Sequence, residues 1–379
     1  MTNVNAFNLD PDLIYLNHAA VAPWPRTTVE AVAAFATENA TLGATNYPQW
    51  LVKEQALRVL GAELINAPSQ ADIALLKNTS EGLSLIAHGI DWKPGDRVVS
   101  IAQEFPSNRI VWESLRSQGV QLQLLDLENH RNPVEALIAL CDERTRLISV
   151  SSVQYASGLR LHLEPLGAYC REQDILFVVD AIQSLGVIPF DVQACQADVV
   201  VADGHKWMLG PEGLALFYCR DALRERLQLH QYGWHMVEDA GNFDRIDWQP
   251  ARSGRRFECG SPNMLGIHAL HASLSLLLKI GVENVTDRVF ELTQKIVDQV
   301  DEQGFELLTP RDPDVRAGIV TFRVPERDNQ SLYQGLMTSR VICAHRAGGI
   351  RFSPHFHNTP EQIDTAFQRL KALISRSEP

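Results

Sequence analysis

The sequence predicts an α/β protein, with a mostly parallel seven-stranded sheet in a large domain and a smaller α+β domain beside it. Short β-rich runs alternate with helical stretches through the first two thirds of the chain. Several of these runs are apolar throughout, which is typical of strands covered by helices on both faces. A length of 379 residues also exceeds what one hydrophobic core usually holds, which favours two domains.

The strands of the large domain are expected between residues 73 and 219. Helical stretches such as 80–90 and 132–143 separate most of them, as parallel pairing requires. The last two strands are joined by a short turn, which predicts an antiparallel pair, because a parallel crossover needs about a dozen residues. The strand candidates are 73–78, 97–102, 121–127, 146–153, 175–181, 199–204 and 214–219.

The pattern changes after about residue 265. The amphipathic run 265–303 predicts one or two helices, and shorter strand candidates follow it. A closing helix is expected from about Thr359 to Ser375, with Thr359 as its cap and a proline in its first turn. We therefore place the large domain at residues 16–265 and the small domain at residues 1–15 and 266–379.

Charge and cysteine content narrow the classes of function. A net charge of −12 argues against a nucleic-acid partner or an anionic membrane, which would favour a basic patch. The 6 cysteines are scattered without a C-x-x-C pair, which fits reduced thiols and gives no zinc framework. We expect no signal peptide and no bilayer-spanning run, and so a cytoplasmic protein.

Chemically useful side chains follow several strands, at the edge where open α/β sheets bind ligands. Because a buried lysine is costly unless something uses it, a lysine directly after a buried strand stands out. With it come an aspartate, an aromatic ring and hydroxyls at a helix N-terminus, a set that fits pyridoxal phosphate, a planar phosphorylated aldehyde. The residues are Asn78, Thr79, Ser80, Phe105, Asp180, Gln183, His205 and Lys206.

Seven segments, in order and over nearly the whole chain, resemble the class V aminotransferase superfamily. This is the group of pyridoxal-phosphate (PLP) fold type I that includes cysteine desulfurases, selenocysteine lyases, isopenicillin-N epimerase and kynureninase. One such segment would be weak support, whereas seven in family order are specific. They are YLNHAA (15–20), NTSEG (78–82), EFPSN (104–108), VVDAIQS (178–184), ADGHKWMLGPEG (202–213), RRFECGSPN (255–263) and IRFSPHFHNT (350–359).

The resemblance implies roles around the cofactor ring. Lys206 would form the Schiff base with pyridoxal 5'-phosphate and would carry the proton at the substrate Cα. Asp180 would hold the pyridine nitrogen, and Gln183 would contact the ring hydroxyl. Phe105 would stack on the ring, because FPSN is similar to the FPTD of kynureninase.

The resemblance also implies phosphate contacts and a dimer. Thr79, Ser80 and His205 would bind the phosphate. Ser261 would reach the phosphate of the neighbouring subunit, so a homodimer is expected.

An α-amino acid is the implied small-molecule substrate. Arg351 would clamp its carboxylate with a two-pronged guanidinium pair, and Arg346 and His18 are further candidates for contact with it. Other pocket candidates by family position are Asn17, Tyr47, Trp50, Trp234 and His235.

Several departures from the family pattern bear on the reaction. Desulfurases carry a mobile loop with a nucleophilic cysteine before the carboxylate arginine, whereas here Arg346 and Arg351 are almost adjacent and the loop is missing. Cys343 lies in a strand candidate, so a protein-bound persulfide is not expected. Phe105 replaces the stacking histidine of the desulfurases, and Asp203 stands where some relatives have a phosphate-binding serine.

Plainer interpretations stand beside these. Lys206 can be a surface lysine, Asp180 a strand-end cap, and Thr79 and Ser80 simple helix caps. The paired histidines at 268 and 271 and at 355 and 357 lack an accompanying Asp, Glu or Cys cluster, so no metal is expected.

We predict an enzyme that labilises the Cα–H bond of an amino acid, with transamination or β-elimination of the C–S lyase type as the outcome. An epimerase, a non-catalytic protein that binds pyridoxal phosphate, and a plain binding module remain the alternatives.

Overall fold

The computed structural model describes residues 6–130 and 132–376 and contains a central sheet of seven strands. The strands lie in the order β2-β8-β7-β6-β5-β3-β4. Their bounds are β2 Ile73–Leu76, β3 Arg97–Ile101, β4 Gln121–Leu125, β5 Thr145–Ser151, β6 Leu176–Asp180, β7 Val199–Asp203 and β8 Ala215–Cys219.

All the pairings in this sheet are parallel except those of β8, which runs antiparallel to both β7 and β2. The predicted seven-stranded, mostly parallel sheet is therefore confirmed, as is the antiparallel pair at its end. Ser151 pairs with Asp180, and Asp180 with Val201. The carboxyl ends of β5, β6 and β7 thus meet at one edge of the sheet.

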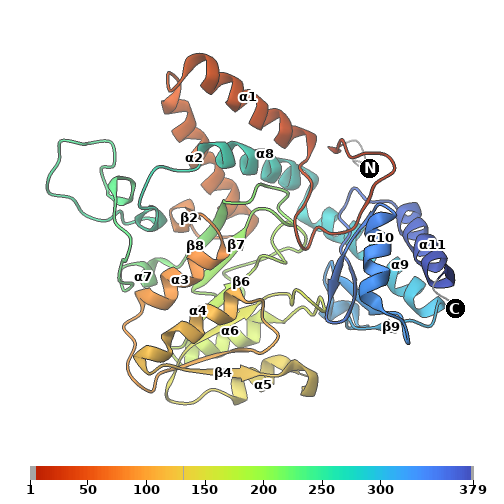
Figure 1. The fold of residues 1–379 in the computed structure, drawn as a ribbon. Coiled ribbons are helices and arrows are strands. Elements are labelled where there is room, and N and C mark those ends of the chain that lie inside the picture. Colours follow the sequence, from red (N-terminus) through yellow and green to blue (C-terminus); the bar gives the residue numbers. More distant parts are fainter. Residues whose placement is uncertain (1–5, 131, 377–379) are drawn as a thin grey trace.

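Helices cover both faces of the sheet (Figure 1). Because side chains alternate along a strand, β7 sends Val200 into the core shared with α2, α5, α6 and α8, and Val201 into the core under α3 and α4. This double burial explains the unbroken apolar runs in the sequence. The bounds are α1 Arg26–Leu42, α2 Tyr47–Leu64, α3 Thr79–Gly89, α4 Ser107–Glu113, α5 Pro133–Ala139, α6 Leu163–Glu172, α7 Asp221–Arg224 and α8 Met264–Ile280.

The C-terminal elements gather at one side of the sheet around a core of their own (Figure 1). A four-stranded sheet has the order β12-β13-β10-β9, and β1 near the N-terminus pairs in parallel with β11. The strands are β1 Ile14–Tyr15, β9 Glu306–Leu307, β10 Val320–Arg323, β11 Val341–Ile342, β12 Ala344–Arg346 and β13 Gly349–Phe352. The helices are α9 Val282–Glu302, α10 Asn329–Thr338 and α11 Pro360–Arg376.

The predicted amphipathic run 265–303 forms two helices, α8 and α9, bent by 81° at their junction. Helix α8 packs on α1 and α2 and buries Leu270 and Leu274 in the core of the large sheet. The boundary at residue 265 stays a prediction. In the described part of the chain, no single helix is long and apolar enough to cross a membrane, although the bent pair α8 and α9 passes that test together by length and composition.

A tight hairpin joins β12 to β13. Its turn consists of Ala347 and Gly348, with φ angles of 49° and 70°. Two central residues with positive φ are the signature of a type I′ turn, whose twist matches that of the flanking strands. The hairpin leaves no room between Arg346 and Gly349 for an inserted loop, as the sequence indicated.

Candidate active site

A cavity of about 320 Å³ lies at the carboxyl edge of the large sheet. Its walls come from strand ends of that sheet, from the start of α3 and from the β12–β13 hairpin. A cavity of this size admits a small organic ligand. It is lined by Ala19, Ala20, Asn78, Thr79, Ser80, Phe105, Ser107, Tyr155, Asp180, Ile182, Gln183, Asp203, His205, Lys206, Arg346 and Arg351.

The N-terminus of α3 forms one wall as an anion site. The Asn78 side chain caps the helix by accepting from the Glu81 amide at 2.9 Å, and the Glu81 side chain accepts from the Lys77 amide at 2.6 Å. These two hydrogen bonds do not use the first-turn amides of Thr79 and Ser80. Both amides are therefore available to a ligand at the positive end of the helix dipole.

Lys206 and Asp180 face the cavity from the ends of neighbouring strands. Burial lowers the pKa of Lys206 to about 8, with Asp180 opposing this effect and Arg351 adding to it. Burial also raises the pKa of Asp180 to about 7, although the Ile182 amide donates to its carboxylate at 3.0 Å. The site thus holds an amine and an acid that both titrate near neutral pH, as groups that exchange protons do.

Gln183 lines the cavity, but both its amide oxygen and its amide nitrogen already form hydrogen bonds within the protein. Its oxygen accepts from the Trp207 indole at 2.7 Å, and its nitrogen donates to the Ala19 carbonyl at 3.0 Å. One amide proton remains for the predicted contact with a ring hydroxyl. The bond to the indole also holds Trp207, the residue that follows Lys206.

Asp203 and His205 lie side by side below the α3 terminus. The Asp203 amide donates to the Thr79 hydroxyl at 3.2 Å. The Asp203 Oδ1 and His205 Nδ1 atoms are 3.0 Å apart, yet their angle is not that of a hydrogen bond, so both atoms remain without a partner in the described structure. The N-terminus of α3 therefore faces a carboxylate–imidazole pair, that of Asp203 and His205.

Phe105 forms the opposite wall. It is 41% exposed and packs edge-on against Tyr155, with ring centroids 5.2 Å apart. The Lys206 amine lies 5.6 Å from the Phe105 ring centre, so the ring faces the space in front of the amine. Beneath it, Glu104 is buried and accepts from the Ser151 amide and the Gln154 side chain, which fixes the loop that carries Phe105.

Arg351 enters the cavity from β13. It is 1% exposed, and its Nη1 donates to the Tyr155 carbonyl at 2.6 Å. Its Nε and Nη2 atoms have no partner in the described structure. Burial, and after it the nearby Arg346, lowers the pKa of Arg351 to about 9. Nε and Nη2 form one edge of the guanidinium, which matches the two oxygens of a carboxylate.

Two predicted residues lie elsewhere. His18 is fully buried, and its ring nitrogens contact the Ser353 carbonyl at 2.9 Å and His357 at 3.0 Å. It is not among the lining residues, so a contact between His18 and substrate has no geometric support. Ser261 is exposed and lines a separate hollow beside Lys77 and Glu81.

The further candidates by family position also lie away from the cavity lining. Tyr155 is one of the lining residues to which sequence reasoning gave no role. Asn17, Tyr47, Trp50, Trp234 and His235 do not line the cavity. Tyr155 follows β5 and meets Arg351 through its backbone carbonyl, a contact that side-chain patterns do not reveal.

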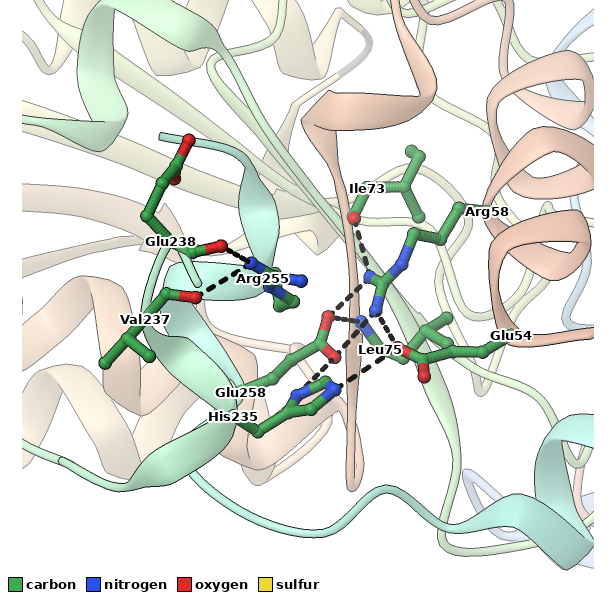
Figure 2. Close-up of polar contacts among 9 residues, drawn as sticks. All are labelled: Glu54, Arg58, Ile73, Leu75, His235, Val237, Glu238, Arg255 and Glu258. Carbon is green, nitrogen blue, oxygen red and sulfur yellow. Dashed lines mark hydrogen bonds and ion pairs between the residues drawn. The ribbon is translucent and has the colours of Figure 1, made fainter. Parts of the chain in front are cut away.

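A buried charge cluster, also missed, ties α2 to the segment before α8 (Figure 2). Glu54, His235 and Glu258 bring potential metal-ligand atoms within 4.8 Å of one another. Arg58 already occupies the space between the carboxylates, donating to Glu258 at 2.5 and 2.8 Å and to Glu54. Each nitrogen of His235 faces a different carboxylate at 3.7 Å, an arrangement that suits an ion-pair network.

The comparisons with known proteins identify the family of the chain. Residues 14–365 match the family described as aminotransferase class-V. A "probable cysteine desulfurase" of Methanothermobacter thermautotrophicus is 30% identical, over 96% of this chain and 95% of the relative. An uncharacterized aminotransferase of Bacillus subtilis is 29% identical, over 86% of both chains.

Solved structures share the fold. The apo structure of a cysteine desulfurase from Thermococcus onnurineus NA1 superposes with a TM-score of 0.86 at 25% identity, covering 96% of this chain and 95% of the other. The resemblance therefore extends over both sheets.

Proposed function

Because the chain belongs to the aminotransferase class-V family of pyridoxal-phosphate-dependent enzymes, we propose that Lys206 holds the cofactor and that an α-amino acid reacts in front of Phe105. The observation that carries the proposal is the meeting of Lys206, Asp180 and the free edge of Arg351 in one cavity. The reaction is transamination or β-elimination at a C–S bond.

The residues present fit the cofactor. When bound, pyridoxal phosphate supplies an aldehyde that bonds to amines and a protonated ring that withdraws electrons from the substrate Cα. Asp180 would pair with the ring nitrogen and keep it protonated. The positive charge of that ring nitrogen would favour the carboxylate form of Asp180, whose pKa is otherwise raised by burial. The amides of Thr79 and Ser80, with His205, would receive the phosphate, and Phe105 would cover the ring.

Arg351 would set the orientation of the substrate. Its Nε and Nη2 would bind the α-carboxylate, and the Tyr155 carbonyl holds the guanidinium in place for that contact. Lys206, with a pKa of about 8, is suited to take the Cα proton and to return it at neutral pH.

The positions of the cysteines support release of sulfur from the substrate without its transfer to a cysteine of the protein. In the described structure, no cysteine lines the cavity. Cys343, the cysteine nearest Arg346 in sequence, is 1% exposed, and burial raises its pKa to about 12. A thiol of that kind is a poor nucleophile. Elimination would release the sulfur as a free thiol and, with one water consumed, would give pyruvate and ammonia as the other products.

We further propose a cytoplasmic homodimer. Ser261 is exposed in a hollow bordered by Lys77, which directly precedes the α3 cap. A two-fold partner would carry its own Ser261 to the phosphate end of the neighbouring cavity. The 6 free cysteines suit a reducing compartment.

The test is a visible absorption spectrum of the protein with pyridoxal phosphate, before and after addition of amino acids. We expect a band that Lys206→Ala abolishes and that S-substituted cysteines shift, with pyruvate and thiol as products of elimination. Formation of a keto acid from alanine without thiol release would identify transamination. A protein that never takes up the cofactor would refute the proposal.

A further inference from the structure

The β12–β13 hairpin places two arginines on one face. Arg346 pairs with Gly349, and Ala344 pairs with Arg351. Directly paired residues share a face, and so do residues two apart on one strand. Arg346 and Arg351 are therefore diagonal neighbours, with Cα atoms about 7–8 Å apart. The two-residue turn of Ala347 and Gly348 fixes this register.

Both guanidinium groups line the cavity, and neither has an acidic partner in the described structure. Arg351 donates to one carbonyl, and Arg346 donates to its neighbour's carbonyl, that of His345, at 2.8 Å. Lys206 lines the same cavity, and both arginines lower the pKa of its amine.

The two acids of the cavity do not balance these cations. Asp180 accepts from the Ile182 amide and, in the proposed function, serves the ring nitrogen. Asp203 lies against His205. A buried or half-buried charge without a counter-ion is costly. In the proposed function the cofactor phosphate would lie against Thr79, Ser80 and His205, so the substrate is the remaining source of negative charge for the two arginines.

One α-carboxylate does not satisfy both arginines. Arg351 offers a single free edge, and a carboxylate with two oxygens fills it. Arg346 then still faces the cavity without an anion. We propose that the substrate is an amino acid whose side chain carries a second acidic group, which Arg346 binds. This inference rests on the proposed function and adds the substrate class to it.

The test compares pairs of ligands that differ only in charge. The pairs are L-aspartate with L-asparagine, L-glutamate with L-glutamine, and S-carboxymethyl-L-cysteine with its amide, S-carbamoylmethyl-L-cysteine. Titration of the absorption band gives a Kd for each. We expect the acid of at least one pair to bind about tenfold or more tightly than its amide, with a preference that weakens as salt is added.

Arg346 variants assign the preference to its side chain. In Arg346→Gln the ratio of the two Kd values should fall below about twofold, and Arg346→Lys should keep part of it because the charge remains. Cofactor content and thermal unfolding of each variant show whether the fold is intact.

Three outcomes are decisive. Equal binding of acid and amide by the unaltered protein would overturn the inference and leave the proposed function standing. A preference that survives in Arg346→Gln would assign the second anion to another group and overturn it as well. If no amino acid shifts the band at all, the proposed function itself fails.

Discussion

At the scale of single residues, Lys206 shows how burial creates reactivity. Lys206 is 8% exposed, and two arginines and two aspartates act on the charge of its amine. Desolvation disfavours the ammonium form, so the pKa falls from 10.5 to about 8. A lysine on the surface would be almost wholly protonated at neutral pH.

Capture of pyridoxal phosphate by the cofactor-free protein should accelerate as pH rises through about 8, the pKa of Lys206. Only the neutral amine attacks an aldehyde, and its fraction grows about tenfold per pH unit below the pKa. Removing the Arg346 charge in Arg346→Gln should raise the pKa of Lys206 and move the midpoint to higher pH. Stopped-flow absorbance measures both rates; a midpoint at the ordinary 10.5 would contradict the assignment.

Cys343→Ala should leave the release of sulfur from S-substituted cysteines within about twofold of the unaltered protein, because a buried thiol of high pKa takes no part. Mass spectrometry of the protein during turnover should detect no persulfide. A persulfide on Cys343, or loss of thiol release in the variant with its fold retained, would require a covalent sulfur step.

At the scale of elements, the strand ends explain how much of the site was predictable. Apolar runs marked β2 to β8, and the residues after β2, β3, β6 and β7 do meet at one cavity, including Phe105, Asp180 and Lys206. The position of His18 could not be predicted from strand ends. Its contacts, Ser353 and His357, lie more than 300 residues later in the chain. Sequence patterns do not reveal packing between such distant segments.

The turn between β12 and β13 should accept an Asn-Gly sequence with a gain in stability. Ala347 holds a φ of 49°, which disfavours a residue with a Cβ, whereas asparagine tolerates this region well. Ala347→Asn should raise the free energy of unfolding by about 0.5–1 kcal/mol, and Gly348→Ala should lower it by a similar amount. Denaturant titration measures both; a destabilised Ala347→Asn would mean that the turn is not type I′.

The cluster in Figure 2 should be a strong anchor for the segment that leads to Ser261. The Glu258 carboxylate accepts hydrogen bonds from the Arg58 guanidinium and from the Leu75 amide, the latter at 2.8 Å. Glu258→Gln should lower stability by about 3–5 kcal/mol, because it leaves the buried Arg58 short of a partner. Glu291→Gln removes an exposed carboxylate that pairs with Arg288; it is the matched control and should cost about 0–1 kcal/mol. Equal midpoints of unfolding would show that the cluster contributes little.

At the scale of the whole molecule, the proposed dimer makes each cavity a shared structure. One chain would supply Lys206 and its neighbours, and the other would supply Ser261. Neither the sequence nor a single chain displays this sharing directly. The resemblance to the class V family implies it, and Ser261 is exposed outside the cavity of its own chain, as such a contact requires.

Complementation between two inactive variants tests the shared cavity. Lys206→Ala removes the reactive amine, and Ser261→Asp would place a negative charge against the phosphate of the neighbouring site. Co-expression should restore part of the activity, because one cavity of each mixed dimer combines an intact Lys206 with an intact Ser261. Mixed dimers that stay inactive, while each variant remains folded and dimeric, would exclude a contribution across the interface.

The pairing of β1 with β11 has a consequence for how the chain is made on the ribosome. Ile14 and Tyr15 are synthesised more than 300 residues before their partners, Val341 and Ile342. At about 5–20 residues per second, the segment waits on the order of tens of seconds before its partner exists. The large sheet can form meanwhile, since its strands end at Cys219. Completion of the C-terminal unit, and with it the delivery of Arg351 to the cavity, therefore comes after the strands of the large sheet have been synthesised.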